Sequence, residues 1–210
     1  MKSLVTAAIV GAALAATAGA APSVTMTLVA SAPSVAYGSP VTLSGQISTK
    51  QANQQITIRK TECGTTKQVK AASVKTGTNG TFSTPVTPTL GTSYVGTFKN
   101  GTSPVVAITV KPVLELKRVA RRSFTANVTA GQALTGKYLS FQRYKKLLKR
   151  WVQVKRVKLA RAVPGTTKPT MVTSVSFKSR LTRGTRLRVL ISKAQAAPCY
   201  VKAASKSIRA

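Results

Sequence analysis

Short runs of alternating apolar and polar residues make up the chain from Ser23 onward, and Gly, Pro, Asn, Ser and Thr separate them. The runs are rich in Val, Ile and Thr, which favour pleated surfaces. The first group of predicted strands comprises 24–29, 41–47, 55–61, 67–76, 81–86, 92–98 and 104–110. The second group comprises 113–118, 123–129, 137–143, 150–159, 171–178, 185–191 and about 199–208. Alternation of this kind predicts an all-β fold.

Each group holds seven strands, a number typical of an immunoglobulin-like sandwich. Two Asn-Gly dipeptides, beginning at Asn79 and Asn100, offer the positive φ angles of tight hairpins. We expect them to join the fourth strand to the fifth and the sixth to the seventh. Lys111 and Pro112 then form a rigid joint. The sequence predicts two tandem immunoglobulin-like β-sandwich domains, residues 21–111 and residues 112–210.

Local similarity between the two halves supports this division. The segment QITIRKTECGTTKQVKAASV has the same plan as KYLSFQRYKKLLKRWVQVKRVKL, namely a strand, a polar turn and a strand. The segment TFSTPVTPTLGTSY likewise parallels SFKSRLTRGTRL. Repetition of this kind indicates tandem copies of one module.

The N-terminus has the composition of a secretory signal peptide. It contains one lysine, an apolar run from Leu4 to about Ala16, and the small-x-small pair Ala18 and Ala20. This arrangement predicts a signal peptide at residues 1–20 with cleavage after Ala20. The alternative is an uncleaved membrane anchor. Because no second apolar span occurs, we expect a secreted mature protein without an integral membrane span.

The charge of the chain indicates which kinds of partner it attracts. The chain has 33 Lys and Arg against two acids, Glu62 and Glu115, and its net charge is +31. Residues 112–210 carry 24 of these cations and one acid. A charge of this size attracts polyanions. The predicted partners are therefore anionic cell-envelope polymers or acidic glycans, with nucleic acid and anionic lipid as alternatives.

The densest basic segment is RYKKLLKRWVQVKRVKLAR, residues 143–161, in which nine of nineteen residues are Lys or Arg around the only tryptophan, Trp151. The predicted polyanion-binding residues are Lys145, Lys146, Lys149, Arg150, Lys155, Arg156, Lys158, Arg183, Arg186 and Arg188. We expect Phe141 and Trp151 to point into the sandwich and Tyr144 to lie near a turn, although aromatics among cations also resemble a nucleic-acid surface. A basic membrane-binding helix over 143–151 is a further alternative, because Leu147, Leu148 and Trp151 have helical spacing.

Enzyme chemistry has little support. The chain contains no His and no Asp, which removes the common triads, imidazole metal sites and Asp-containing carboxylate pairs. Glu62 and Glu115 lie in different modules and are expected to pair with Lys60 and Lys117. We therefore expect no catalytic residue, no metal, no cofactor and no small-molecule substrate.

The two cysteines, Cys63 and Cys199, fall in different modules. If successive strands alternate in direction, the loop after the third strand of module one and the loop after the sixth strand of module two both face the joint. An exported chain meets an oxidising compartment. We therefore predict a disulfide across the joint; two free thiols and a disulfide-linked dimer are the alternatives.

The segments YGSPVTLSG, TNGTFSTPVTPTLGTSYVGTF, VKPVLELKRV and CYVKAASKSIR resemble secreted bacterial proteins, chiefly actinobacterial, with tandem immunoglobulin-like domains and no assigned activity. The resemblance implies an extracellular pair of β-sandwiches and brings no catalytic residues. The expected function is a secreted, non-enzymatic binding or structural module of the cell envelope that docks on teichoic or teichuronic acid or an acidic glycan. Extracellular nucleic-acid or host-surface binding and a membrane-active cationic protein are the alternatives.

Overall fold

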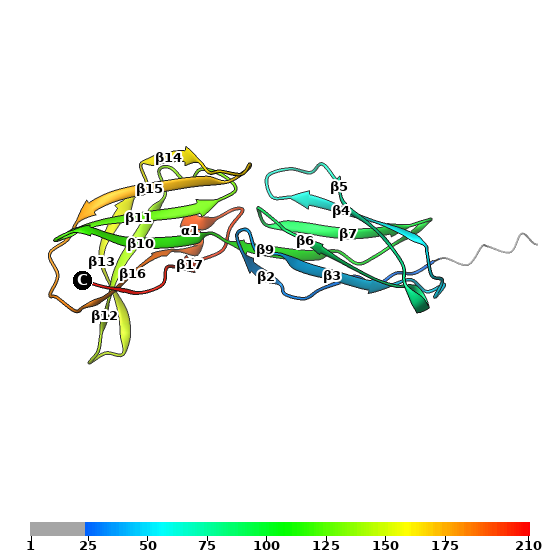
Figure 1. The fold of residues 1–210 in the computed structure, drawn as a ribbon, viewed down its shortest axis with the longest axis horizontal. Helices are drawn as coiled ribbons and strands as arrows, with labels where there is room; N and C mark the ends of the chain where they lie inside the picture. The colour runs from blue at the N-terminus through cyan, green and yellow to red at the C-terminus, as the bar shows by residue number, and fades with distance from the viewer. Residues whose placement is uncertain (1–23) are drawn as a thin grey trace, which may run out of the picture.

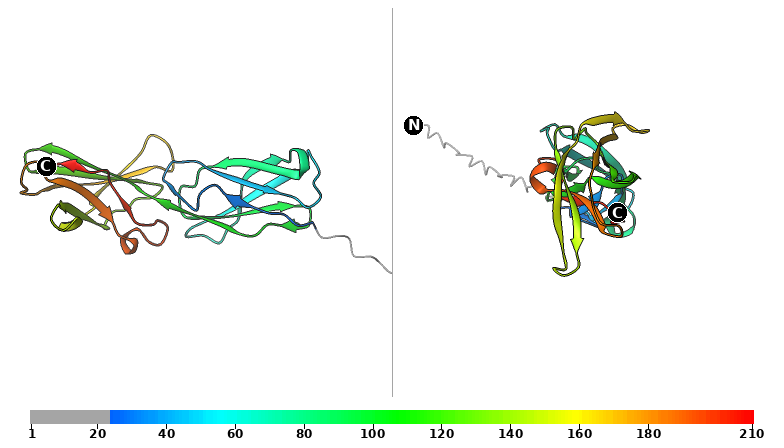
Figure 2. Two further views of the ribbon diagram at one scale, coloured as in Figure 1. Left: turned by 90° about the horizontal axis from the view of Figure 1, so that it is seen from below. Right: turned by 90° about the vertical axis from the view of Figure 1, so that its left-hand side faces the viewer.

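The computed structural model describes residues 24–210, so the expected signal peptide at residues 1–20 lies outside the described residues. Two β-sandwiches lie end to end, and the chain passes once from one to the other (Figure 1). A view from below shows the same elongated arrangement (Figure 2). The second sandwich therefore presents one end to the joint and the other away from it.

The first sandwich is built from nine strands within the described residues. They are β1 (Val29–Ala30), β2 (Ser34–Ala36), β3 (Val41–Gln46), β4 (Gln55–Glu62), β5 (Val69–Lys75), β6 (Thr81–Val86), β7 (Thr92–Phe98), β8 (Gly101–Thr102) and β9 (Val106–Lys111). One sheet has the order β1-β3-β6 and the other β2-β9-β7-β4-β5, with β8 added to β7. The short strand β2 pairs with β9 in parallel and closes one side of the sandwich.

The second sandwich follows directly. Its strands are β10 (Val113–Ala120), β11 (Ser123–Ala130), β12 (Tyr138–Lys145), β13 (Arg150–Lys158), β14 (Arg161–Pro164), β15 (Met171–Lys178), β16 (Arg186–Ile191), β17 (Ala203–Ala204) and β18 (Ile208–Arg209). One sheet has the order β10-β11-β15-β14 and the other β13-β12-β16-β17, with β18 also paired to β16. A four-residue helix, α1 (Lys193–Ala196), precedes β17.

This strand order confirms the predicted fold class. In both sandwiches the chain alternates between two sheets, antiparallel except for the pairing of β2 with β9, in the manner of immunoglobulin-like domains. The β4–β5 and β12–β13 hairpins occupy matching positions, and each contains one register shift, after Ile58 and after Phe141. The similarity of these two segments in the sequence therefore corresponds to a structural repeat.

Alternation along the strands builds both cores. In the first sandwich, Leu43, Ile58 and Tyr94 are buried. In the second, Phe124, Phe141 and Phe177 pack against one another with ring centroids 4.9 to 5.9 Å apart. Their edge-on and stacked contacts stabilise the interior beyond simple burial.

The sequence was a poorer guide to the short strands and to the chain termini. The predicted strand 24–29 has the expected buried alternation at Met26 and Leu28, but regular pairing begins only at Val29. Strands β2, β8 and β14 span two to four residues each, too few for an alternating pattern to be visible. The predicted strand 199–208 is interrupted, because the Ser205 hydroxyl accepts a hydrogen bond from the Val189 amide between β17 and β18.

One of the two predicted Asn-Gly hairpins is wrong. Asn79 and Gly80 do adopt positive φ angles, 58° and 69°, but they connect β5 and β6, which belong to different sheets. The second pair of predicted strands does pair, as β7 with β9, but the tight turn after Phe98 consists of Lys99 and Asn100, and its positive φ falls on Lys99. A residue with a positive φ thus indicates that the chain reverses its direction, but it does not determine whether the next strand pairs with the preceding one.

The predicted disulfide is confirmed. Cys63 in the β4–β5 loop is bonded to Cys199 in the β16–β17 loop, and the two cysteines are 136 residues apart. Backbone hydrogen bonds reinforce the joint: the Gly91 amide donates to the Cys199 carbonyl at 2.9 Å, and the Val201 amide donates to the Val110 carbonyl at 3.0 Å. The joint is therefore held by covalent and backbone contacts together.

Side chains complete this joint. The Tyr200 hydroxyl accepts a hydrogen bond from the Gly131 amide at 2.7 Å and donates to the Thr89 carbonyl at 3.1 Å. The hydroxyls of Tyr37 and Thr170 lie 2.9 Å apart on another side of the joint. Together with the Cys63 bond, these contacts come from three loops of the first sandwich, and they therefore restrict rotation of one sandwich against the other.

Candidate anion-binding surface

The basic segment forms a long hairpin in the second sandwich. Strands β12 and β13 pair from Tyr138 opposite Lys158 to Lys145 opposite Arg150, and Lys146–Lys149 form the turn. The hairpin stands out from the body of the sandwich in two perpendicular views (Figures 1 and 2). The expected strand, turn and strand are confirmed, and the alternative of a basic helix over 143–151 is wrong.

A β-bulge decides which way the tryptophan faces. Phe141 lies opposite Lys155, whereas Gln142 lies opposite Gln153, so Val154 is an extra residue on β13. Such an insertion reverses the alternation of the strand beyond it. Phe141 is buried as expected, but Trp151 lies opposite Tyr144 on the outer face and remains half-buried. The prediction that Trp151 points into the sandwich is therefore wrong.

Trp151 and Tyr144 are covered by arginines from the neighbouring strand β16. The two aromatic rings meet edge to face with centroids 5.4 Å apart. The Arg188 guanidinium carbon lies 4.2 Å from the Trp151 ring centroid, and that of Arg186 lies 5.4 Å from the Tyr144 centroid. Cation–π contacts of this geometry hold each guanidinium over a ring and leave its edge free to donate.

Arg188 is fixed further by a polar contact. Its Nε donates to the Gln142 side-chain oxygen at 2.8 Å. Partial burial lowers the pKa of Arg188 from its ordinary value, but an arginine stays charged at neutral pH. A third stack lies nearer the joint, where the Arg156 guanidinium carbon is 4.6 Å from the Tyr138 ring centroid. The outer face of this sheet is therefore an ordered array of aromatics and cations.

We call this array the basic aromatic face. Its members are Tyr138, Tyr144, Trp151, Arg156, Lys158, Arg186 and Arg188. It contains four of the ten cations predicted to bind polyanions. Three other predicted cations point to the opposite side of the hairpin. Lys145 follows Tyr144 in the alternation of β12 and pairs with Arg150, and Lys155 lies opposite the buried Phe141. Lys146 and Lys149 lie in the turn, and Arg183 lies in the β15–β16 loop.

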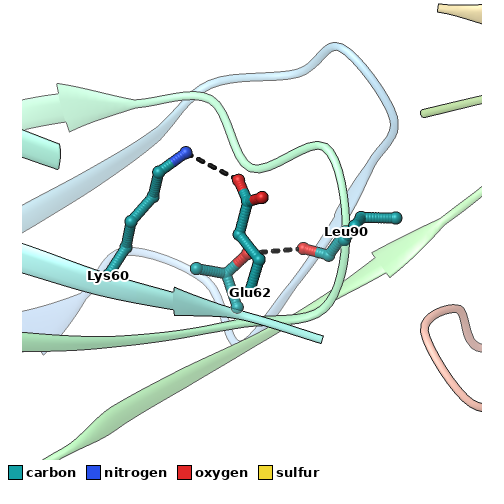
Figure 3. Close-up of polar contacts among 4 residues, drawn as sticks. Lys60, Glu62 and Leu90 are labelled. Carbon is teal, nitrogen blue, oxygen red and sulfur yellow. Dashed lines mark hydrogen bonds and ion pairs between the residues drawn. The ribbon is translucent and has the colours of Figure 1, made fainter. Parts of the chain in front are cut away.

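Both acids of the chain are engaged elsewhere. Lys60 forms an ion pair with Glu62 at 2.6 Å in the first sandwich. Figure 3 shows this pair beside the Leu90 carbonyl, which accepts a hydrogen bond from the Thr92 hydroxyl at 2.7 Å. Lys117 pairs with Glu115 at 3.1 Å on β10. The expected pairings are confirmed, and neither carboxylate belongs to the basic aromatic face.

Residues 24–210 contain no group of three or more His, Cys, Asp and Glu side chains placed to hold a metal ion. In the same part of the chain no helix is long and apolar enough to cross a membrane. The basic aromatic face consists of guanidiniums, an ammonium and aromatic rings.

Sequence reasoning missed a second gathering of cations. Arg118 near the end of β10 and the turn residues Arg121 and Arg122 join Arg183 around a cavity of about 450 Å³ at the end of the second sandwich away from the joint. The adjacent arginines in VARRSF fall between two predicted strands, so a tight arginine turn was visible in the sequence. Arg183 was among the predicted polyanion-binding residues, but nothing in the sequence indicated that it lies beside this turn.

Comparisons with known proteins add little to this description. No protein-family model and no curated protein sequence matches the chain. Two solved structures described as a marsupial T cell receptor are 11% identical to it; the alignments cover 88% and 89% of this chain and 99% of each receptor chain, with TM-scores of 0.31 and 0.30. At these TM-scores the likeness carries no argument, and the immunoglobulin-like description rests on the strand order above.

Proposed function

We propose that this chain is a secreted, non-enzymatic binding module that docks on anionic polymers of the cell envelope, such as teichoic acid, teichuronic acid or an acidic glycan. The basic aromatic face carries the proposal. It places four cations on one side of one sheet and holds three of them over aromatic rings. Guanidiniums fixed in this way lose little side-chain freedom when they bind a phosphate or carboxylate.

The field around the face supports the same function. Residues 112–210 contain 24 Lys and Arg and one acid, and that acid is already paired with Lys117. A surface of one sign attracts polyanions over a distance of about 8 Å at physiological ionic strength. Binding should therefore be strong at low salt and fall steeply as salt is added.

The joint gives the module its mechanical role. The disulfide Cys63–Cys199 and the Tyr200 contacts hold the two sandwiches end to end. Disulfides form and persist in oxidising compartments, which supports secretion. The first sandwich then acts as a spacer that presents the basic second sandwich to its ligand.

The hairpin turn favours a second candidate, binding to anionic lipid. Leu147 is 99% exposed and Leu148 is 49% exposed, and Lys146 and Lys149 flank them. An apolar tip within a ring of cations, with Trp151 and Tyr144 behind it, has the order of side chains that suits a membrane interface. Inserting one such leucine contributes roughly 1.5–3 kcal/mol.

A bead assay distinguishes the candidates. The full chain is incubated with purified teichoic-acid-bearing cell wall, with duplex DNA and with phosphatidylglycerol vesicles, at about 50 and 200 mM salt. The face variant is Arg156→Gln/Arg186→Gln/Arg188→Gln, and the matched control is Lys67→Gln/Lys70→Gln/Lys75→Gln in the first sandwich, which removes the same charge.

The proposal expects cell-wall binding that the face variant loses and the control keeps. If both variants lost the same amount of binding, the total charge of the chain would explain the binding without the basic aromatic face, and the proposal would be overturned. A chain that binds vesicles alone, and releases them in Leu147→Asn/Leu148→Asn, would establish the lipid candidate in its place. Preference for DNA over cell wall would make the protein a nucleic-acid binder, and the slope of log affinity against log salt should then fall by about 2 to 3 in the face variant.

A further inference from the structure

The end of the second sandwich that points away from the joint contains a cavity of about 450 Å³. Arg118, Arg121, Arg122 and Arg183 surround it, and the buried ring of Phe124 lies against it. We call it the arginine pocket. Its volume falls in the range of small-molecule sites, and none of its arginines belongs to the basic aromatic face.

Two tight turns hold the arginines in place. Ala120 pairs with Ser123, so Arg121 and Arg122 form a two-residue turn. Arg122 has a φ of 62°, a conformation that costs an L-residue free energy and tends to be retained at functional sites. Its carbonyl accepts a hydrogen bond from the Ser179 amide at 2.9 Å. The first turn is thereby tied to the segment that leads to the second.

The second turn carries Arg183. Gly184 has a φ of 79°, which a glycine adopts without strain. The Thr185 hydroxyl donates to the Thr182 carbonyl at 2.7 Å and closes the turn. Three of the pocket's arginines therefore come from two restrained loops, and Arg118 comes from the end of β10.

The corresponding loops of the first sandwich contact the second sandwich. In the first sandwich, the loop from β2 to β3 contains Tyr37 and the loop from β6 to β7 contains Thr89. Tyr37 contacts Thr170, and Thr89 contacts Tyr200, both in the second sandwich. In the second sandwich the matching loops, from β10 to β11 and from β15 to β16, frame the arginine pocket. The pocket therefore lies at the end of the second sandwich that corresponds to the joint end of the first, with arginines in place of the first sandwich's neutral side chains.

The charge of the pocket indicates what it takes. Neither ion pair within residues 24–210 involves its four arginines. Four guanidiniums of one sign around a single cavity repel one another, and an anion placed among them relieves that repulsion; the last residue, Ala210, also lines the cavity. Arginine forks bind phosphate oxygens in pairs of hydrogen bonds. A planar carboxylate reaches few of them at once, whereas linked tetrahedral phosphates direct oxygens to all sides.

We propose that the arginine pocket is a specific site for a phosphate-type oxyanion with more than one phosphate group, with pyrophosphate as its simplest form. The forks of Arg121 and Arg183, one from each loop, grip the ligand from opposite sides, while Arg118 and Arg122 add charge. The site is separate from the docking surface proposed above and does not depend on it.

Calorimetric titration of the full chain with pyrophosphate at about 150 mM salt, where exposed charges are screened beyond about 8 Å, tests the proposal. Arg121→Lys/Arg183→Lys keeps every charge and removes both forks. Lys145→Gln/Lys155→Gln removes two charges from the hairpin and serves as the control. Circular dichroism of each variant without ligand confirms that it is folded.

We expect one saturable site per chain, affinity for pyrophosphate above that for orthophosphate, sulfate and citrate, and a loss of about tenfold or more in the lysine variant. The hairpin control should bind within about twofold of wild type. The proposal would be overturned if the lysine variant bound with wild-type affinity or if the hairpin control lost as much affinity as the lysine variant. It would also be overturned if the titration showed no saturable site. Cell-wall capture by Arg121→Lys/Arg183→Lys should match wild type, which keeps this test distinct from that of the docking surface.

Discussion

Removal of the disulfide across the joint is the sharpest test of how the two sandwiches are coupled. Cys63→Ser/Cys199→Ser leaves neither a bond nor a free thiol. In the oxidised chain the bond links residues 136 positions apart, so it greatly restricts the unfolded ensemble. The folded chain keeps the backbone contacts of Gly91 and Val201 across the joint.

The expected loss follows from the loop length. In the chain-entropy model a loop of this size contributes on the order of 5 kcal/mol to the free energy of unfolding. Native-state strain and residual unfolded structure commonly reduce such values, so we expect a loss of about 3–5 kcal/mol. We also expect two separate unfolding transitions, because two cores joined only by the chain at Lys111 and Pro112 and by noncovalent contacts constrain each other less when one of them unfolds.

Urea unfolding followed by circular dichroism measures both effects. The oxidised wild type, the wild type with reductant and the double serine variant are compared. The reduced wild type should match the serine variant. A loss below about 1 kcal/mol in both, which is small against the range for native disulfides, together with one cooperative transition, would refute the view that the bond governs the coupling of the sandwiches.

Three further predictions concern the joint and the buried phenols. Tyr200→Phe removes the acceptor of the Gly131 amide and should cost about 1–3 kcal/mol in urea unfolding, since that amide is left unpaired. Gly131→Ala would place a methyl group 2.9 Å from the Thr89 carbonyl oxygen and should cost a further 1–3 kcal/mol, roughly, by overpacking the joint; retention of wild-type stability in either variant would contradict these contacts. Burial raises the pKa values of Tyr94 and Tyr200 to about 12. Because these values lie above the ordinary 10, each phenol contributes stability below pH 10 that is lost as the pH rises through about 12. Replacing either with Phe should therefore lower the tyrosinate absorbance at pH 11 by only about a tenth of one phenolate, and a fall close to one full phenolate would show that the phenol is not buried.

Much of the fold was predictable because its information is local. Alternation identified most of the longer strands, and the repeat of QITIRKTECGTTKQVKAASV in the second half identified the matching hairpins. The alternating direction of successive strands also placed Cys63 and Cys199 in loops that face the joint. These features depend on short patterns or on rules of connection, and both can be recognised in one sequence.

The candidate surface was less predictable, because one inserted residue changes it. Without the bulge at Val154, Trp151 would lie on the same face as Lys155 and Val157, which is the face expected from simple alternation. The bulge instead brings Trp151 against Arg188 of a distant strand. Contacts between residues far apart in the sequence cannot be recognised in the local pattern. For the same reason the sequence did not predict that Arg121 and Arg183 line one cavity.

Trp151 offers the most direct test of the central claim, since it is the only tryptophan of the chain and lies in the basic aromatic face. Its fluorescence is followed while purified teichoic acid is added to the full chain at about 50 and 200 mM salt. We expect a saturable change in emission that weakens steeply at the higher salt and is lost in Arg156→Gln/Lys158→Gln, two substitutions on the face that do not contact the indole. Polymer binding that leaves the Trp151 emission unchanged would contradict docking at this face.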